Sequence, residues 1–527
     1  MKCCLEGKNV FVTGGGGVGK TFLVHKIVEE LERQGREVML AAPTGLAAQL
    51  IGGVTCHRAF KIPIYSAWEK EPEINADDPV CLTDAVVIDE ISMFRMDAFN
   101  FFIKCIEAAN AIRSKKGKPP IQIIAVGDFL QLPPVVVIPK DGSPSVAKLM
   151  SDYYKFDVGE AFAFQSPEWA RLNFTVCNLE EVVRQSDAAA VSILNRIRYD
   201  DRTALVPLIN ATRKKPYTAS DKGVVYLCGK NSTANRINAR ALDKLSGPKK
   251  VYYGSKDDTV SEKDMIAPLN VTLCVGARVM ILVNGDHYAN GSLGTITFLG
   301  DNHVCVKLDS SGMEVPIAYS SWDVMAYVVD KDKHVRQEVV GRYSLLPLRL
   351  CYAITIHKSQ GQTLDKAVLI VGKNASEIFV PGQPYVGVSR VKDLKNLYID
   401  GDLTRIKKLA SSTVIEYYRS VGIAIPDPPV SEPEEPASAI TSVKENTEDP
   451  SPVAKKTKKR QPKKAKQFSP ESVTEREEVA VSVPNGLQTI ILAFAAVLDP
   501  DAHVNGSAIY VSSGTAEAVA EFASNFT

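Results

Sequence analysis

The sequence lacks the features that define secreted, zinc-dependent and membrane-spanning proteins. Its ten cysteines are scattered, with no Cys-x-x-Cys pair and no Cys/His ligand spacing. This argues against a disulfide framework and a zinc site, and favours free thiols in a reducing compartment. We see no signal peptide before the first predicted strand and no apolar run long enough to cross a bilayer. With a formal net charge of +1, any basic surface for nucleic acid must be local.

What the chain does have is the composition of a globular protein. It is 527 residues long, 45% apolar and 23% charged, which is ordinary for a soluble protein and leaves room for about two to four domains. Short apolar runs alternate with helical periodicity in the first part of the chain. This alternation predicts an α/β fold with a parallel sheet and right-handed crossovers.

A glycine-rich stretch near the start predicts a phosphate-binding loop. Residues 9–13 form a predicted strand, the pattern G-x-x-x-x-G-K-[ST] follows, and apolar residues then recur at helical spacing. Glycines let backbone N–H groups turn around an anion, and the helix N-terminus adds a positive dipole end. We expect Lys20 to reach the β and γ phosphates of ATP and Thr21 to ligate Mg²⁺. The residues expected to contact ATP here are Gly14, Gly15, Gly16, Gly17, Val18, Gly19, Lys20 and Thr21.

Polar residues follow two further predicted strands. Asp89 and Glu90 stand in tandem after the apolar run at 85–88. Asp89 can hold Mg²⁺ through water, and Glu90 can orient or deprotonate the attacking water. Gln131 follows the strand at 121–126 after a short turn, where it can donate to the γ-phosphate or position that water. The set indicates hydrolysis rather than binding alone.

The segment APTGLAAQLIGGVTCHRAF carries a candidate nucleic-acid contact. Thr55 and His57 have groups that bind a sugar-phosphate backbone, and Phe60 can stack on a base. The same pattern also fits an ordinary loop and helix with a hydrogen-bonded histidine.

Four segments together resemble, in order and spacing, the motifs of the Pif-type and RecD-type DNA helicases: GGGGVGKT, APTGLAAQLIGGVTCHRAF, VVIDEISM and GDFLQLPP. These helicases form the branch of superfamily 1 that moves 5′ to 3′ on single-stranded DNA. The resemblance covers roughly residues 8–400. It implies an α/β fold of two RecA-like P-loop domains with parallel sheets, which hold Mg·ATP in the cleft between them.

The resemblance extends to two arginines. Arg184 in LEEVVRQ looks like the family's arginine that reaches across the cleft to the γ-phosphate, and Arg390 in YVGVSRV resembles the arginine of the family's last motif. An arginine suits this role because its planar fork can hold two phosphate oxygens at once. Together with Lys20, Glu90 and Gln131, these arginines form the expected catalytic set.

The segment TIHKSQG is the most diagnostic stretch after the phosphate-binding loop. Thr355, His357, Lys358 and Ser359 bring a cation, an imidazole and hydroxyls together, which suits a nucleic-acid phosphate backbone. Gly361 permits close approach of the nucleotide or of the neighbouring domain. We expect the first four residues to bind DNA and Gly361 to contact ATP.

A strand-rich region punctuated by glycine turns precedes that segment and predicts an all-β insert. The resemblance implies a small barrel of the Src-homology (SH3-like) type beside the DNA path, and a filler without ligand contact is the alternative. The expected divisions are a first RecA-like domain at 1–175 with a short wedge-like insert at 60–84, a second RecA-like domain at 176–269 and 348–424, the β-barrel insert at 270–347, a disordered linker at 425–483, and a small C-terminal segment at 484–527.

The predicted linker is rich in Pro, Glu, Ser and Lys, so it buries too little apolar area to offset the entropy of ordering. Eight of the twelve residues from Lys455 to Lys466 are basic. This cluster fits a nuclear-import signal, a nonspecific nucleic-acid tether or a solvated linker. The C-terminal segment has short apolar runs and could bind a protein partner.

The sequence departs from the family pattern in two places. The family usually has a glutamine-bearing segment before the phosphate-binding loop that reads adenine, and none of the eight residues before the first strand is glutamine. Weak adenine selectivity, a residue from elsewhere and a truncated chain all remain open. There is also no convincing β-hairpin wedge between Phe60 and Asp84, where Trp68 is the candidate to stack on a base.

These features predict an ATP-dependent, Mg²⁺-using DNA helicase that moves 5′ to 3′, in replication, repair or recombination. Its expected partners are single-stranded and forked duplex DNA, on which it would act as a monomer, with no membrane. It would be intracellular: nuclear if the chain is eukaryotic or viral in a eukaryotic host, and cytoplasmic otherwise. A translocase that remodels without separating strands is the main alternative. A non-enzymatic adaptor is disfavoured by the intact catalytic set, and an RNA track is left open.

Overall fold

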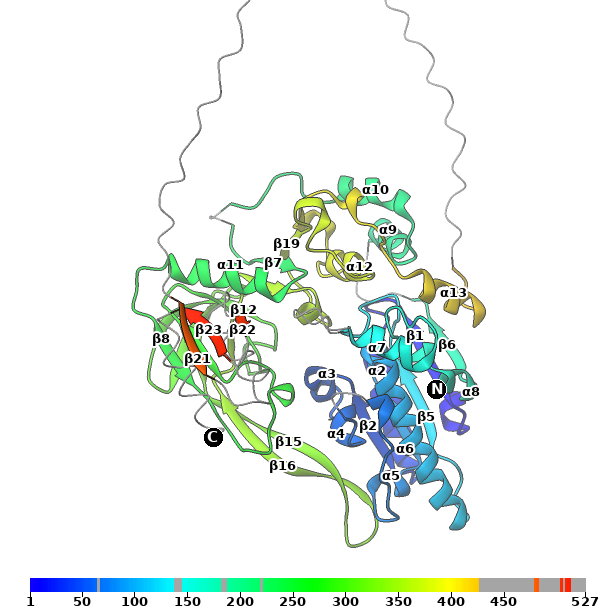
Figure 1. Ribbon diagram of the computed structural model, residues 1–527. Coiled ribbons are helices and arrows are strands. Elements are labelled where there is room, and N and C mark those ends of the chain that lie inside the picture. Colours follow the sequence, from blue (N-terminus) through cyan, green and yellow to red (C-terminus); the bar gives the residue numbers. More distant parts are fainter. Residues whose placement is uncertain are drawn as a thin grey trace, which may run out of the picture. The chain divides into compact units, whose positions relative to one another are not determined.

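The computed structural model of this chain describes residues 1–63, 67–136, 145–181, 187–218 and 221–425, and three short strands beyond them. The chain divides into two compact units, Met1–Glu434 and Glu435–Thr527. Figure 1 labels the helices and strands. Within the described ranges, no helix combines the length and the apolarity needed to cross a membrane.

The first unit opens with a six-stranded parallel sheet in the order β3-β2-β4-β5-β1-β6. Both faces of the sheet are buried. In β1, Val10 and Val12 belong to the core under helix α2 (Lys20–Arg33), and Phe11 belongs to the core that includes residues of helix α6 (Met96–Lys115). Double burial explains the nearly continuous apolar runs of these strands. The strands are β1 Val10–Gly14, β2 Val38–Ala42, β3 Val54–Thr55, β4 Ala85–Ile88, β5 Gln122–Val126 and β6 Thr175–Leu179.

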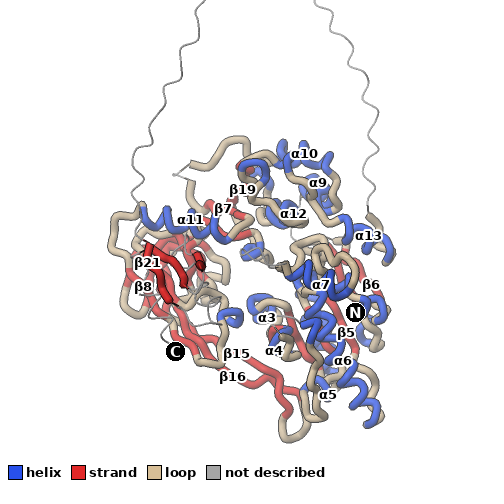
Figure 2. Tube along the Cα trace, viewed as in Figure 1, coloured by secondary structure: helices blue, strands red, loops and turns tan. Residues whose placement is uncertain are grey.

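Helices flank this sheet, as Figure 2 shows in blue beside the red strands. They are α1 Lys2–Leu5, α2 Lys20–Arg33, α3 Gly45–Leu50, α4 Cys56–Ala59, α5 Pro79–Leu82, α6 Met96–Lys115, α7 Val146–Tyr154 and α8 Pro167–Arg171. Because β6 pairs with β1 as far as Leu179, the first sheet runs past the boundary expected at residue 175. Trp68 is 6% exposed and packs among apolar side chains that include Met96, so its ring is not presented for stacking on a base.

The second parallel sheet has the order β18-β7-β19-β20. Its strands are β7 Val224–Cys228, β18 Ala353–Thr355, β19 Lys366–Ile370 and β20 Leu397–Asp400, and its helices are α9 Ala188–Arg198, α10 Leu205–Ala211, α11 Asn231–Asp243 and α12 Gln383–Val388. Two parallel sheets with covering helices confirm the predicted α/β class.

An all-β region separates β7 from β18 in the chain, and it begins earlier than expected. Strand β8 at Lys250–Tyr253 already pairs with β10, upstream of the predicted start at residue 270. The antiparallel sheets are β14-β13-β12-β11-β17, β15-β16-β9 and β10-β8. That this region forms an SH3-like barrel stays a prediction. The strands are β8, β9 Ser255–Lys256, β10 Asn270–Leu273, β11 Arg278–Ile281, β12 Leu293–Leu299, β13 His303–Leu308, β14 Glu314–Ala318, β15 Ser320–Val329, β16 Val335–Leu345 and β17 Leu348–Leu350.

The long β15–β16 hairpin, light green in Figure 1, contacts the first sheet. The Leu40 N–H of β2 donates to the Tyr327 hydroxyl at 2.6 Å, and that hydroxyl donates to the Leu40 carbonyl at 3.1 Å. Strand β3 pairs with β2 only at Ala41 and Ala42, so the tyrosine completes a short edge. His334 Nδ1 lies 2.6 Å from Glu37 Oε1.

Helix α13 (Ser412–Ser420) packs on the first sheet rather than on the second, where the predicted 348–424 division placed it. Val414 and Tyr418 belong to the same buried cluster as Phe11 and Phe129. The Trp169 indole donates to the Tyr417 hydroxyl at 2.8 Å. The chain therefore returns to its first domain after completing the second sheet.

In the second unit the structure describes only backbone strands: β21 Glu478–Ser482, β22 His503–Asn505 and β23 Ala508–Ser512, paired antiparallel in the order β21-β23-β22. Strand β21 lies near the C-terminal end of the segment at 425–483 that is predicted to be a disordered linker, and the linker stays a prediction. The rest of the linker, including the basic cluster, lies outside the described residues.

Candidate active site

The glycine-rich loop lies between β1 and α2, as the sequence predicts. Gly14 has a φ of +143°, and a Cβ there would come within 2.4 Å of the Leu179 carbonyl oxygen of β6, so only glycine fits. Lys20 Nζ donates to the carbonyl oxygens of Gly14 at 2.8 Å and Gly15 at 2.9 Å. The ammonium group therefore lies against the loop, at the N-terminus of helix α2 where an anion is favoured.

Three carboxylates surround this lysine. Burial lowers the pKa of Lys20, and the negative charges of Asp128, Glu90 and Asp89 oppose that shift. All three acids follow the carboxyl ends of β4 and β5, the edge where parallel α/β sheets bind their ligands. A positive group among paired acids at this edge suits a metal–phosphate complex.

Asp89 and Glu90 differ in their surroundings. Asp89 is 5% exposed and accepts the Glu90 backbone N–H at 2.8 Å, and burial raises its pKa. Burial, together with the charge of Asp89, raises the pKa of Glu90 to about 7. Glu90 also has a φ of 52°, in the left-handed region that residues other than glycine rarely adopt. A carboxyl group with a pKa near neutrality can accept a proton at physiological pH.

The oxygen donors of Thr21 and Asp89 fit Mg²⁺, which prefers hard oxygen ligands, keeps several waters and binds substrate phosphates. No cluster of three or more His, Cys, Asp or Glu side chains with metal-ligand geometry occurs in the part of the chain that the structure describes. A cation here would therefore need oxygen atoms from the nucleotide and from water.

Gln131 lies at this edge, and a second glutamine joins it from the other sheet. Gln131 Nε2 donates to Asp128 Oδ2 at 3.3 Å. Gln360 Nε2 donates to Glu90 Oε2 at 3.0 Å and lies 3.4 Å from Gln131 Oε1. Motif spacing does not assign Gln360 to the ATP site, because only the folded chain brings the TIHKSQG segment to Glu90.

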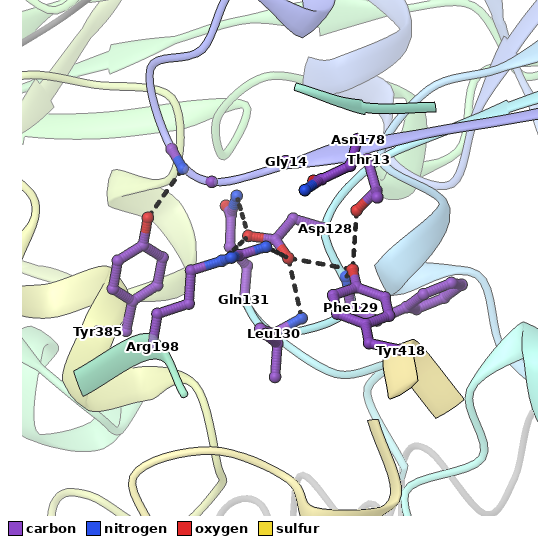
Figure 3. Close-up of polar contacts among 12 residues, drawn as sticks. Thr13, Gly14, Asp128, Phe129, Leu130, Gln131, Asn178, Arg198, Tyr385 and Tyr418 are labelled. Atoms are coloured by element: carbon purple, nitrogen blue, oxygen red, sulfur yellow. Dashed lines mark hydrogen bonds and ion pairs between the residues drawn. The ribbon is translucent and has the colours of Figure 1, made fainter. Parts of the chain in front are cut away.

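A buried ion pair also connects the two sheets (Figure 3). The Arg198 guanidinium from helix α9 donates to both carboxylate oxygens of Asp128, at 2.8 and 3.0 Å. Burial favours the neutral carboxyl, but the charge of Arg198 and its hydrogen bonds outweigh burial and lower the pKa of Asp128. No sequence motif assigns Arg198 a role, because its partner Asp128 lies 70 residues away in the chain.

Two tyrosines extend this network, as Figure 3 shows. The Tyr418 hydroxyl lies 2.8 Å from Thr13 Oγ1, accepts the Phe129 N–H at 2.9 Å and donates to Asp128 at 3.2 Å. On the other side, the Gly16 N–H of the glycine-rich loop donates to the Tyr385 hydroxyl at 2.8 Å. The second sheet's domain thus contacts the loop directly, through a residue of the YVGVSRV motif that sequence analysis passed over.

The structure describes only one of the two arginines that are expected to contact the γ-phosphate. Arg184 lies outside the described residues. Arg390 is 2% exposed, and its guanidinium donates to the backbone carbonyls of Val386, Ser359 and Gln362 at 2.7, 3.1 and 3.4 Å. In this structure Arg390 therefore ties helix α12 to the TIHKSQG loop.

The residues expected to bind DNA near helix α4 are only partly accessible. Thr55 and His57 are half-buried at the start of helix α4. Phe60 is 3% exposed, and its ring packs edge-on against Phe102 with centroids 4.7 Å apart. Because its ring belongs to the core, Phe60 is not a stacking residue, and that expectation is wrong.

Of the residues expected to bind DNA in the TIHKSQG segment, some shape the loop and others face solvent. Thr355 and Ser359 are buried: Thr355 Oγ1 accepts the Lys358 N–H at 3.3 Å, and the Ser359 hydroxyl donates to a backbone carbonyl at 2.8 Å. Lys358 keeps a solvent-exposed side chain, although partial burial and the positive charge of Arg349 lower its pKa. His357 is half-buried and Gly361 is exposed with a φ of +78°.

Comparison with known proteins gives a consistent result. A sequence profile described as PIF1-like helicase matches residues 2–193. The ATP-dependent DNA helicase Pif1 of Bdellovibrio bacteriovorus is 30% identical over 414 residues, which cover 75% of this chain and 85% of that protein. The human ATP-dependent DNA helicase PIF1 is 31% identical over 458 residues, covering 81% of this chain but 64% of its own length.

Solved structures agree. The crystal structure of Bacteroides Pif1 with ADP-AlF4 superposes with a TM-score of 0.65 at 31% identity, covering 79% of this chain and 95% of that one. A second structure of a Bacteroides Pif1 helicase, with ADP-AlF3 and single-stranded DNA, has a TM-score of 0.54 at 31% identity with the same coverage.

Proposed function

This chain belongs to the PIF1-like helicase family, and from that membership we infer that it is an ATP-dependent DNA helicase that moves 5′ to 3′ along single-stranded DNA. One contact in this structure supports coupling between DNA binding and ATP hydrolysis. Gln360, at the end of the expected DNA loop, is hydrogen-bonded to the expected catalytic base Glu90, so events at DNA and at ATP can influence each other.

We propose that the glycine-rich loop binds ATP through its backbone N–H groups and Lys20, with Gly361 approaching from the other sheet. Thr21 and Asp89 would hold Mg²⁺, whose charge stabilises the phosphates during transfer. Support comes from the carboxylates around Lys20 and from the hard oxygen donors. Tyr385 must release the Gly16 N–H when phosphate oxygens take that position.

In hydrolysis, Glu90 accepts a proton from the attacking water as its oxygen bonds to the γ-phosphorus. The bond from the γ-phosphorus to the bridging oxygen then breaks, and its electrons stay with ADP. Gln131 orients the water or donates to the γ-phosphate. Arg184 and Arg390 would stabilise the transferring group, and for Arg390 this requires exchange of its present carbonyl partners for phosphate.

Single-stranded DNA would contact Thr55 and His57 from the first sheet, and His357 and Lys358 from the second, while Thr355 and Ser359 shape the second loop. Alternating grip by the two sheets converts closure around ATP into steps along the strand. Forked duplex DNA is the proposed substrate and a monomer the proposed active form. The C-terminal segment is a candidate protein-binding element, and the basic cluster a nuclear signal in a eukaryotic host.

The test is ATP hydrolysis with and without single-stranded DNA, followed by unwinding of duplexes carrying a 5′ tail, a 3′ tail or no tail. We expect strong stimulation and unwinding from the 5′ tail alone. Lys20→Ala is the control and should abolish both activities together, since the ammonium group lies at the phosphate loop. Unwinding that persists without ATP hydrolysis would refute the mechanism.

A translocase that moves on DNA without separating strands is the second candidate. The segment between Phe60 and Asp84 favours it, because its described residues form only a short 3-10 turn (Ala67–Glu69) and helix α5, with Trp68 buried. DNA-stimulated ATP hydrolysis without any unwound product would select this candidate.

A further inference from the structure

Gln360 joins the hydrolysis site to the DNA loop at the level of single atoms. It directly follows the 3-10 turn His357–Ser359, which leads out of β18 in the second sheet. Its Nε2 reaches Glu90 Oε2 at 3.0 Å and Gln131 Oε1 at 3.4 Å. Both partners belong to the first sheet's domain, so this amide crosses between the two domains.

The amide of Gln360 is only half satisfied. Its Oε1 is buried and has no hydrogen-bond partner among the described residues. An unpaired buried acceptor is costly, so the side chain is kept in this position by its donor contacts with Glu90 and Gln131. Such an arrangement is readily exchanged for another when the loop shifts.

The contact with Glu90 opposes the chemistry that Glu90 has to perform. A donor on Oε2 occupies a lone pair and stabilises the carboxylate, which weakens it as a proton acceptor. Glu90 has a left-handed backbone and its N–H is bonded to Asp89 Oδ1, so its backbone position is set locally. We therefore expect relief of the contact to come from movement of the Gln360 side chain.

The loop that carries Gln360 is internally braced. Thr355 Oγ1 accepts the Lys358 N–H, the Ser359 hydroxyl bonds the Ile356 carbonyl, and Arg390 donates to the Ser359 carbonyl. These bonds tie Lys358 to Thr355, and Ser359 to Ile356 and Arg390. Because Lys358 and Gln360 flank Ser359 in one braced turn, we expect a displacement at Lys358 to move the amide of Gln360 with it.

We propose that Gln360 is a positioning residue that restrains the base Glu90 until single-stranded DNA binds the Thr355–Ser359 loop. DNA phosphates draw Lys358 outward, the braced loop follows, and the amide leaves Glu90 free to accept the water proton. The proposal rests on the proposed function and specifies how DNA stimulates ATP hydrolysis. On this proposal, hydrolysis is slow without DNA because Gln360 restrains Glu90, and not because catalytic residues are still out of place.

The test variant is Gln360→Met, which keeps the length of the side chain and removes the donor. We expect kcat without DNA to rise about ten- to a hundredfold, which corresponds to the loss of one hydrogen bond to a charged group. The DNA-saturated kcat and the KM for ATP should change less than about twofold. The stimulation ratio therefore falls in proportion to the rise in the DNA-free rate.

Gln362→Met is the matched control. Gln362 lies in the same loop, and its carbonyl oxygen accepts a hydrogen bond from Arg390 that a side-chain substitution leaves in place. Both rates should match wild type. Gln360→Asn is the second test variant: it keeps the amide but is one methylene shorter, so it should behave as Gln360→Met if reach to Glu90 is what matters. Thermal unfolding of each variant monitors folding.

Two outcomes would overturn the proposal. An unchanged DNA-free rate in folded Gln360→Met and Gln360→Asn would show that the contact does not restrain Glu90. An equal fall of both rates would place Gln360 in the hydrolysis machinery instead. Wild type that shows no stimulation by DNA refutes the proposed function itself, and this is established before any variant is compared.

Discussion

The Arg198–Asp128 pair is the residue-scale feature with the largest expected effect on stability. Arg198→Ala leaves the carboxylate of Asp128 buried and uncompensated, because the pair is 3% and 0% exposed. Losing one partner of such a pair costs about 3–5 kcal/mol of folding free energy. Urea denaturation followed by tryptophan fluorescence measures this cost. In the double variant Arg198→Leu/Asp128→Leu much of the loss should be recovered, and equal destabilisation of single and double variants would contradict the argument.

The pair also sets a sign for pH dependence. Asp128 has its pKa lowered below the ordinary value of 3.8, with the charge of Arg198 and its hydrogen bonds outweighing burial. A carboxyl group with a depressed folded pKa contributes stability above its unfolded pKa, and loses it as the pH falls through the folded value. The pair therefore contributes fully at neutral pH and is lost only in strong acid.

Residues that act through local spacing were predictable, and residues that act through long-range contacts were not. Lys20 and Glu90 follow predicted strands, and the fold brings them together as expected. Gln360 meets Glu90 across 270 positions, and Tyr418 meets Thr13 across 405. No periodicity or motif spacing encodes such contacts. Phe60 was wrongly predicted because an aromatic side chain after a polar turn suits a core as well as a base.

At the scale of elements, the β15–β16 hairpin carries a pH-dependent contact with the first sheet. The hydrogen bond and charge of Glu37 raise the pKa of His334 above its ordinary 6.5, Asp330 adds to the shift, and Arg336 opposes it. A raised folded pKa contributes stability below the unfolded value and loses it as pH rises through the folded value.

We therefore expect hydrogen exchange in the hairpin to be slower in wild type than in His334→Gln at about pH 6, and the difference to shrink as the pH rises through the raised folded pKa of His334. Hydrogen-exchange mass spectrometry resolves the β15–β16 strands from the rest of the chain. A difference that persists unchanged at high pH would show that the imidazole acts by packing and not by charge.

Helix α13 gives the second prediction at this scale. Tyr418→Phe removes a fully buried hydroxyl and leaves Thr13, the Phe129 N–H and Asp128 each short of a partner. We expect a loss of about 1–3 kcal/mol in unfolding free energy. Tyr417→Phe is the matched control, because the Tyr417 hydroxyl accepts a hydrogen bond from the Trp169 indole and lies outside the network around Asp128, so a smaller loss is expected. Equal effects would mean that the network around Asp128 adds nothing.

Elements were predictable where one segment buries its own apolar pattern, and less so where it packs against a distant segment. Continuous apolar runs form the strands β1, β2, β4 and β5, and such runs indicate a sheet that is buried on both faces. The position of α13 depends on a buried face that fits either domain, so its amphipathic pattern does not say which sheet it covers. The early start of the all-β region was missed for the same reason, because β8 is recognisable only through its pairing with β10.

At the scale of the whole molecule, the residues that form the expected active site all belong to Met1–Glu434, whereas the basic cluster from Lys455 to Lys466 belongs to the second unit. We therefore expect the cluster to affect DNA affinity rather than hydrolysis. If it acts as a nonspecific tether, each phosphate it neutralises adds about 0.7 to the slope of log affinity against log salt on single strands.

Replacing the eight basic residues of that cluster by glutamine in the full chain should then weaken DNA binding at low salt and flatten the salt dependence by several units, because fewer counterions are released. The DNA-saturated kcat should stay within about twofold of wild type, since none of the substituted residues belongs to the catalytic set. Fluorescence anisotropy with a labelled oligothymidine across a salt series measures the slope. An unchanged slope would identify the segment as a solvated linker, and would assign the binding electrostatics to Lys358 and its neighbours in the first unit.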